Sequence, residues 1–392
     1  MKKANDMTDA ELQAAVAANV RVLTEHFDPN FSISLEKNLF DSFNAHYFRT
    51  RFIGFEEIPQ RNNPDKPMIY ISNHSGMAFP WDAMVLGSGF LKLNKHDFKD
   101  AFRPLVAPML SQSNLLNPFC LPHFWKRTGG IDATVLNFET MMHYNKSNAL
   151  IYPEGIPGIG KGFNHKYELQ QFSSSFVRMA LKHKTDIVPI LTVNGEYINP
   201  WSYRLDAVNR LSRYVGIAFL PISPILLLLP ICPWIFYFAF PARLTYVLGQ
   251  RIKVYEMTDT PYAEMTTAEV KSIRDRVRAA MQTDLDEAVR LHGQEPFKWR
   301  ELLLNNLKHL NKIAFFSSPG WPMLFHEHDR AFAAKGEKDT PDMKIGFFSI
   351  FGILLRNPFT IFFFIPILGW LPLLIRGYWG NSINHKQVSE PK

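Results

Sequence analysis

The chain has 392 residues, of which 46% are hydrophobic, 14% aromatic and 20% charged. This composition is too apolar for a disordered chain, and the length suits one large domain with appendages or two to three domains. Two cysteines, Cys120 and Cys232, are too few for a disulfide framework or a multi-cysteine zinc site. We therefore expect a reducing, cytosol-facing compartment.

Basic residues exceed acidic ones by 43 to 36, which gives a formal net charge of +7. This balance suits anionic partners such as anionic lipid, a phosphorylated substrate or nucleic acid. The basic residues are scattered, with no run interleaved with stacking aromatics, so we do not expect nucleic acid as a partner. The first twenty residues have no apolar run behind their two lysines, so no secretory signal is expected.

Residues 1–46 are expected to form amphipathic helices, since Thr8 and Glu11 have capping-box spacing before a helical apolar pattern. Apolar strands are expected at 66–74, 148–155 and 185–196, with helical patterns between them. Strands that alternate with helices predict an α/β fold, with a mainly parallel central sheet flanked by helices. We assign residues 47–293 to this domain, which ends with a strand at 244–249 and a helix that Thr266 and Glu269 open and Gly293 stops.

Two apolar regions indicate association with a membrane. Residues 214–242 carry no charge but contain five prolines, which predicts a broken hydrophobic insertion and not one straight helix. In the extension 294–392, residues 345–355 and 357–375 are also uncharged. Their prolines and flanking arginines suit a kinked spanning helix or a re-entrant hairpin, and the alternative is a hairpin that covers the protein core or a dimer partner. We expect a membrane location with the site facing the cytoplasm.

The first cluster with chemical potential follows the first of the three predicted strands and contains Asn73, His74, Ser75 and Gly76, with Asp82 shortly downstream. A histidine beside a carboxylate is the pair that a general base needs, because the carboxylate fixes the imidazole tautomer. Backbone N–H groups near Gly76 are candidates to receive an oxyanion. The alternatives are a structural pair, a helix cap at Asp82, or a serine hydrolase, although the G-x-S-x-G elbow is missing.

The second cluster, residues 152–162, imitates a phosphate-binding P-loop. Gly162 stands where that loop needs Ser or Thr to ligate Mg²⁺, which disfavours a nucleotide triphosphatase. The glycines, among them Gly155, still permit close approach of an anionic group, and Lys161 adds a cation. Glu154, at the predicted strand end, is a candidate to orient an acceptor hydroxyl.

Two further segments contain residues of binding type. Arg127, within a basic aromatic stretch before two glycines, is a candidate for a bidentate contact with a phosphate. Residues 325–329 (Phe-His-Glu-His-Asp) have metal-ligand types but no identifiable distant ligand, so we expect a surface loop and no metal site.

The order of these clusters resembles the glycerolipid and lysophospholipid acyltransferase superfamily, in particular its monoacylglycerol- and diacylglycerol-acyltransferase-like branch. The blocks are NHSG followed by PWD, the basic aromatic stretch before GG, YPEG followed by GIGKGF, and IVPILTVNGE. The resemblance covers roughly residues 47–292. It implies a catalytic His74 with Asp82 as its partner, an acceptor site at Glu154 and Gly155, and a phosphate contact at Arg127.

The first block departs from the commonest family pattern, in which four residues separate the histidine from the aspartate. Phe79 holds that place here, and seven residues separate His74 from Asp82. Asp97 and Asp132 are the alternative partners for the histidine.

The resemblance implies transfer of a fatty acyl group from acyl-CoA or acyl-carrier protein to a hydroxyl of a (lyso)phospholipid or related glycerolipid. A thioester is already activated, so no metal or redox cofactor is expected, and the expected partners are membrane lipids and the acyl donor. Two alternatives stay open: a thioester or lipid hydrolase that uses the same histidine, and a non-enzymatic lipid-binding protein. The oligomeric state is open.

Overall fold

The computed structural model describes residues 7–75, 79–112, 116–205, 207–208, 210, 222–224, 226–316, 318–336, 340–346 and 348–379. Its centre is a seven-stranded sheet with the order β1-β7-β6-β2-β5-β3-β4. Strands β6, β2, β5, β3 and β4 run parallel, whereas β7 is antiparallel to β6 and parallel to β1. The predicted α/β class with a mainly parallel sheet is therefore confirmed. The strands are β1 Arg51–Ile53, β2 Ile69–Ser72, β3 Phe102–Val106, β4 Ile131–Asp132, β5 Asn148–Ile151, β6 Ile187–Val193 and β7 Thr245–Leu248.

The central strands are buried on both faces, as parallel strands usually are. Alternate side chains of β2 enter two different apolar clusters, with Tyr70 on one face and Ile69 and Ile71 on the other. The sheet therefore separates two cores, each covered by its own helices. The helices are α1 Asp9–Asn19, α2 Pro29–Leu35, α3 Trp81–Leu93, α4 Pro108–Gln112, α5 Phe124–Arg127, α6 Val135–Met141, α7 Gly155–Ile159, α8 Ser175–His183, α10 Thr267–His292, α11 Trp299–Lys308, α12 Trp321–Ala334, α13 Ser349–Arg356 and α14 Trp370–Trp379.

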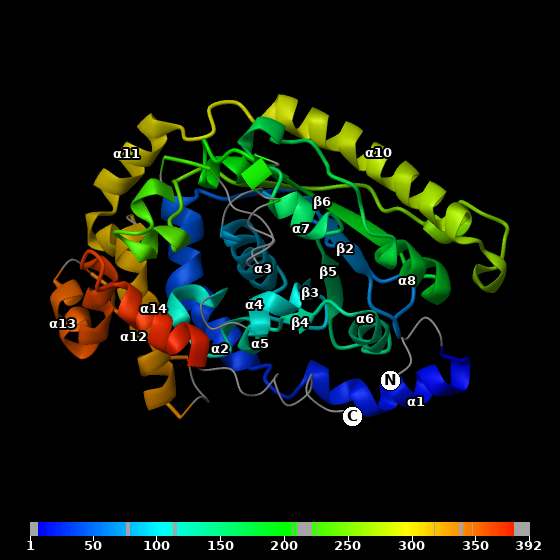
Figure 1. The fold of residues 1–392 in the computed structure, drawn as a ribbon, viewed down its shortest axis with the longest axis horizontal. Coiled ribbons are helices and arrows are strands. Elements are labelled where there is room, and N and C mark those ends of the chain that lie inside the picture. The colour runs from blue at the N-terminus through cyan, green and yellow to red at the C-terminus, as the bar shows by residue number, and fades with distance from the viewer. Residues whose placement is uncertain are drawn as a thin grey trace.

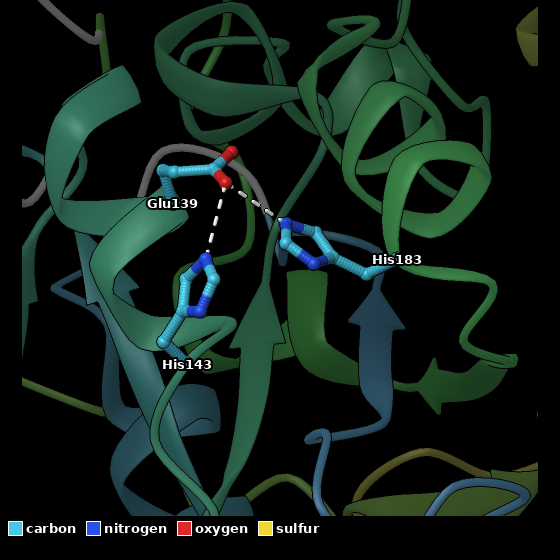
Figure 2. Close-up of side chains that lie close together, drawn as sticks. All are labelled: Glu139, His143 and His183. Atoms are coloured by element: carbon cyan, nitrogen blue, oxygen red, sulfur yellow. Dashed lines mark hydrogen bonds and ion pairs between the residues drawn. The ribbon is translucent and has the colours of Figure 1, made fainter. Parts of the chain in front are cut away.

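Helices α6, α8 and α10 cover the face of Ile69 and Ile71. The capping box predicted for α10 forms: Thr266 Oγ1 accepts the Glu269 N–H at 3.2 Å, and Glu269 Oε2 accepts the Thr266 N–H at 2.7 Å. The corresponding box forms at the start of α1, which packs on α6. The ends of α6 and α8 meet through the side chains of Glu139, His143 and His183 (Figure 2).

The opposite face carries an aromatic core that joins all three predicted regions of the chain. The ring centroid of Phe43, in the π-helical stretch Phe43–Tyr47, lies 4.5 Å from that of Trp321 of α12. Trp81, at the start of α3, lies 4.7 Å from the same ring. Segments 1–46, 47–293 and 294–392 thus contribute to one apolar cluster. Figure 1 shows α11, α12, α13 and α14 gathered at the left end of the molecule, with α10 along the top.

The apolar insertion and the C-terminal run lie together. Within the insertion, residues 222–224 and 226–242 are described and contain the 3₁₀ turns Leu226–Leu228 and Pro233–Tyr237, in agreement with the predicted break by prolines. The run 345–375 divides into α13, a 3₁₀ segment Pro358–Phe364 and α14. Trp370 Nε1 donates to Pro230 O at 2.9 Å and so ties α14 to the insertion. Across the described residues, no helix combines the length and apolarity needed to cross a bilayer.

Candidate functional site

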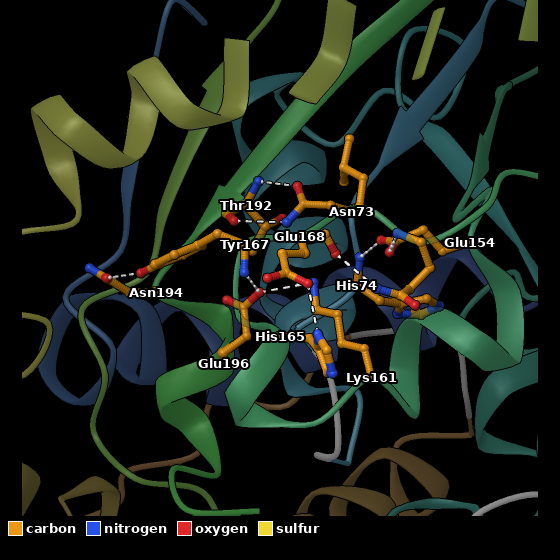
Figure 3. Close-up of polar contacts among 12 residues, drawn as sticks. Asn73, His74, Glu154, Lys161, His165, Tyr167, Glu168, Thr192, Asn194 and Glu196 are labelled. Atoms are coloured by element: carbon orange, nitrogen blue, oxygen red, sulfur yellow. Dashed lines mark hydrogen bonds and ion pairs between the residues drawn. The ribbon is translucent and has the colours of Figure 1, made fainter. Parts of the chain in front are cut away.

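Three parallel strands bring polar residues to one edge of the sheet. Strands β2, β5 and β6 end at this edge, and ligands of open α/β sheets bind outside the carboxyl ends of such strands. Asn73, directly after β2, donates from Nδ2 to Thr192 O at 3.0 Å and accepts the Thr192 N–H at 2.8 Å. This pair of hydrogen bonds fixes the end of β2 against β6. Figure 3 shows the polar side chains collected around this point.

Glu154, after β5, holds the backbone of the predicted catalytic histidine. Its Oε1 accepts the His74 backbone N–H at 2.9 Å, and its Oε2 accepts the Gln170 N–H at 2.7 Å. The side chain is buried, and burial raises the pKa of this carboxyl although the Lys161 charge opposes that rise. Both carboxylate oxygens are therefore engaged by the protein, and Glu154 positions His74. The predicted contact of Glu154 with an acceptor stays a prediction.

His74 presents an uncharged ring to its surroundings. The imidazole stacks on Tyr152 with 4.3 Å between the ring centroids, and within the described residues its Nδ1 has no hydrogen-bond partner. Burial, and then the charge of Lys161, lower the pKa of His74 to about 3. The ring is therefore neutral near pH 7, which is the state that a general base requires.

Asp82 lies in the first turn of α3 and is fully buried. Among the described residues, no hydrogen bond with good geometry reaches either carboxylate oxygen. Burial raises the pKa of Asp82 to about 6, while the neighbouring Ala83 and Ser75 favour the ionised form. In the described part of the chain no hydrogen bond or ion pair joins Asp82 to His74. Their pairing stays a prediction, and Gly76 lies between them, outside the described residues.

The alternative partners of the histidine have other contacts. Asp97 is exposed and accepts the Lys99 backbone N–H at 2.8 Å. Asp132 accepts the Ser111 hydroxyl and pairs with Lys126 Nζ at 3.2 Å. These contacts give both carboxylates structural roles.

Lys161 points into the protein. Its Nζ lies 3.0 Å from Glu196 Oε1, and the two side chains are 0% and 1% exposed. The charges of Glu196 and Glu154 outweigh burial and raise the pKa of Lys161. Glu196 Oε1 also accepts the Tyr167 N–H at 2.9 Å, which ties the segment after α7 to the end of β6. Lys161 is absent from the pocket wall described next, so this position does not support its predicted contact with an anion.

An apolar pocket of about 1430 Å³ opens beside His74. His74, Glu154 and Gly155 line it, and Gly155 has φ +58°, a left-handed conformation that favours glycine. The pocket thereby brings together three of the predicted site residues, His74 from the first cluster and Glu154 and Gly155 from the second. Much of the remaining wall is hydrophobic and comes from α3, β3, the insertion and α14, with Met84, Leu91, Val106, Ile235, Phe236, Trp370 and Leu373.

Arg127 has internal partners in this structure, and its predicted phosphate contact stays a prediction. Its Nη1 lies 2.6 Å from Asp329 Oδ1, and the guanidinium carbon sits 3.6 Å from the centroid of the Phe31 ring. The residue does not line the pocket. Its ion pair and cation–π contact join α5 to α12 and α2, since a planar guanidinium can pair with a carboxylate and stack on an aromatic ring at once.

The prediction of a surface loop at 325–329 is wrong. These residues belong to α12, and His326, Glu327 and His328 are buried. His326 Nε2 contacts Phe119 O at 3.0 Å, and His328 Nε2 contacts Ser34 Oγ at 2.8 Å. The side chains diverge to separate partners, so they anchor the helix and do not converge on one ligand.

One cluster of residues that could bind a metal lies between α6 and α8. The spacing of these residues in the sequence did not reveal it. One ligand atom from each of Glu139, His143 and His183 falls within 4.8 Å of the others (Figure 2). However, Lys182 Nζ lies 2.9 Å from Glu139 Oε1, the oxygen that also contacts both histidines. Burial by itself would raise the pKa of Glu139, but the contacts with His183 and Lys182 lower this pKa to about 2. An ammonium group already neutralises this carboxylate, which favours an ion-pair network over a metal site.

We predict that Zn²⁺ leaves the thermal midpoint of the protein unchanged, because the Lys182 charge repels a cation at this cluster. Differential scanning fluorimetry with added Zn²⁺ and with EDTA measures this. A Zn²⁺-dependent rise that disappears in His183→Ala would contradict the ion-pair interpretation.

We predict that Glu154→Gln lowers the free energy of unfolding by about 1.5–3 kcal/mol, because an amide offers one acceptor oxygen to two backbone N–H groups. Urea unfolding measures the change. Glu168→Gln is the matched control: Glu168 is exposed and contacts His165 Nδ1 at 2.7 Å, so its loss should cost less than about 0.5 kcal/mol. Equal effects of the two substitutions would contradict the positioning role.

Comparison with known proteins shows what this chain is similar to. Residues 49–193 match the family model described as Acyltransferase. Uncharacterized proteins Rv0502 of Mycobacterium tuberculosis and Mb0514 of Mycobacterium bovis are each 28% identical over 291 residues, which cover 72% of this chain and 75% of theirs. The structure of the 1-acyl-sn-glycerophosphate (LPA) acyltransferase PlsC from Thermotoga maritima has 13% identity and a TM-score of 0.36, and covers 72% of this chain and 85% of that chain.

The family match includes both the strand that precedes His74 and the strand that precedes Glu154. It excludes the C-terminal extension from residue 294 onward. Residues 49–193 therefore match the acyltransferase family model, which agrees with the superfamily that the motifs resemble.

Proposed function

We propose that the protein transfers a fatty acyl group from a thioester, acyl-CoA or acyl-carrier protein, to a hydroxyl of a (lyso)phospholipid or related glycerolipid. The family of residues 49–193 supports acyl transfer in general. The observation that carries the proposal is the position of His74, a neutral imidazole at the end of β2 in the wall of a large apolar pocket.

In the proposed step, His74 takes the proton of the acceptor hydroxyl as the hydroxyl oxygen attacks the thioester carbonyl carbon. The carbon–sulfur bond then breaks, and the sulfur leaves as a thiol after it receives the proton from the imidazolium. The acyl group ends as an ester of the acceptor. Cleavage of the thioester supplies the free energy for ester formation, so the proposed step needs no cofactor.

The proposed role of Asp82 follows from the electrostatics of the histidine. Burial and Lys161 disfavour a charged His74, so the imidazolium that forms during reaction needs a negative charge nearby. Glu154 is bound by two backbone N–H groups and Glu196 by Lys161, whereas the Asp82 carboxylate lacks a well-formed hydrogen bond within the described residues. We therefore assign Asp82 the part of the stabilising carboxylate.

The pocket suits a long acyl chain. Its volume exceeds the roughly 300–1,000 Å³ of common small-molecule sites. Each CH₂ group that leaves water for such a wall contributes about 0.8 kcal/mol. The described lining residues include no lysine or arginine. This favours an acceptor without a phosphate next to the reacting hydroxyl, because no lysine or arginine of the described wall would pair with that phosphate.

We predict that His74→Ala lowers acceptor-dependent thiol release by about 10²–10⁴-fold, the usual contribution of general base catalysis. The assay offers an acyl-CoA panel with monoacylglycerol, lysophosphatidate or no acceptor, and mass spectrometry identifies the product. His165→Ala is the control, since this half-exposed histidine contacts only Glu168 among the ion pairs described. Histidine-dependent release without any acceptor would instead identify a thioester hydrolase.

We predict that kcat/KM falls as the pH drops below about 6. The ionised form of Asp82 is required, and its pKa of about 6 means that protonation removes that form at lower pH. His74, with its pKa near 3, stays neutral over the same range and adds no second limb. Asp82→Asn should be less active and should lose the limb, as a pH profile of thiol release from 4.5 to 8 will report. If kcat/KM of Asp82→Asn still falls at acidic pH as the wild type does, the proposed role of Asp82 is wrong.

A further inference from the structure

The C-terminal extension exposes large apolar side chains to an unusual degree. Phe348, the N-cap residue of α13, and Phe351 and Leu355 within the helix recur at helical spacing and are 85%, 69% and 81% exposed. The opposite side of the same helix is buried through Ile353. Helix α13 is thus apolar on both sides, whereas a surface helix normally turns a polar face outward.

The same exposure continues onto α14 and the insertion. Ile367, Leu371, Leu374 and Ile375 are exposed around α14, as are Leu227 and Ile231 in the insertion. The Ile367 N–H donates to Ile231 O at 2.9 Å, so the two segments are adjacent. We call these residues, together with Phe348, Phe351 and Leu355, the C-terminal apolar face.

Helix α14 has two apolar sides with different neighbours. Trp370 and Leu373 line the pocket that contains His74, while Leu371, Leu374 and Ile375 point outward. One helix therefore separates the pocket from the C-terminal apolar face. Figure 1 shows α13 and α14 together at the end of the molecule that is distant from α1 and α8.

We propose that the C-terminal apolar face docks on the surface of a lipid bilayer, with α13 and α14 lying in the interfacial region, and that acyl chains pass between bilayer and pocket beside α14. Helices that lie in this region bury their apolar face about 5–10 Å deep, so α13 and α14 need not span the bilayer. The extension carries more basic than acidic residues, which suits anionic headgroups.

Continuity with the pocket selects lipid over a second copy of the chain. A second copy would cover the outer side of α14 and close the space beside the pocket, whereas a bilayer would cover the face and supply amphiphiles at the same place. This choice of occupant rests on the proposed acyl transfer to a lipid. The docking itself is measurable without any reaction.

The test is flotation of the full-length protein with equimolar phosphatidylcholine and phosphatidylglycerol vesicles. Phe348→Ser, Phe351→Ser and Leu355→Ser are combined in one variant, because these residues do not line the pocket. The matched control combines Val20→Ser and Val135→Ser, two exposed apolar residues on the α1–α6 side. Thermal unfolding verifies that both variants fold.

We expect the triple variant to lose at least about tenfold in its vesicle partition coefficient, while the control binds like the wild type. Equal binding of triple variant and wild type, or no binding by the wild type, would overturn the proposal. Loss of a wild-type dimer in the triple variant without vesicle binding would assign the face to a second copy and would also overturn it. Failure of the proposed function is seen separately, as absence of acyl transfer by wild type to dispersed acceptors while vesicle binding persists.

Discussion

The Glu154 carboxylate bridges two segments that the chain brings together only on folding. It accepts the backbone N–H of His74, after β2, and that of Gln170, in the segment that leads toward α8. A buried carboxylate is costly unless hydrogen bonds compensate it, so the bridge forms only when both segments are in place. The position of the histidine, the pocket beside it and the proposed chemistry all depend on this contact.

Two of the buried charged side chains near His74, Lys161 and Glu196, are paired with each other. Lys161 compensates Glu196 and also lies close enough to influence Glu154, Asp82 and His74. A buried ion pair contributes little net stability, but removal of one partner leaves an uncompensated charge. Lys161, in the P-loop-like segment, therefore neutralises a buried carboxylate. Its positive charge also helps to keep His74 neutral.

The C-terminal extension is part of the same folded body as the acyltransferase residues. Trp321 contacts both Phe43 and Trp81, and Arg127 pairs with Asp329 across more than two hundred residues of chain. Through α14 the extension also forms part of the pocket wall. A region outside the family match thus shapes the space in which that family's chemistry is proposed to occur.

The sequence by itself determined the features set by local periodicity: the apolar strands β2, β5 and β6, the capped helices α1 and α10, the proline break in the insertion, and the polar residues at the strand ends. It also indicated the superfamily, since the order of four motifs is a property of the chain. Short elements such as β1 and β4 were missed because three and two residues carry no measurable period. The surface loop assigned to 325–329 was wrong because burial of α12 is decided by aromatic partners far along the chain.

Only the tertiary structure decided the partners of charged side chains. Lys161 and Arg127 have the residue types of anion ligands, yet the fold supplies each with an internal carboxylate, Glu196 and Asp329. The Glu139 cluster joins helices more than thirty residues apart, and the pocket wall contains residues more than three hundred positions apart. Electrostatic energy depends on distance in space and on burial, and neither quantity is encoded by spacing along the chain.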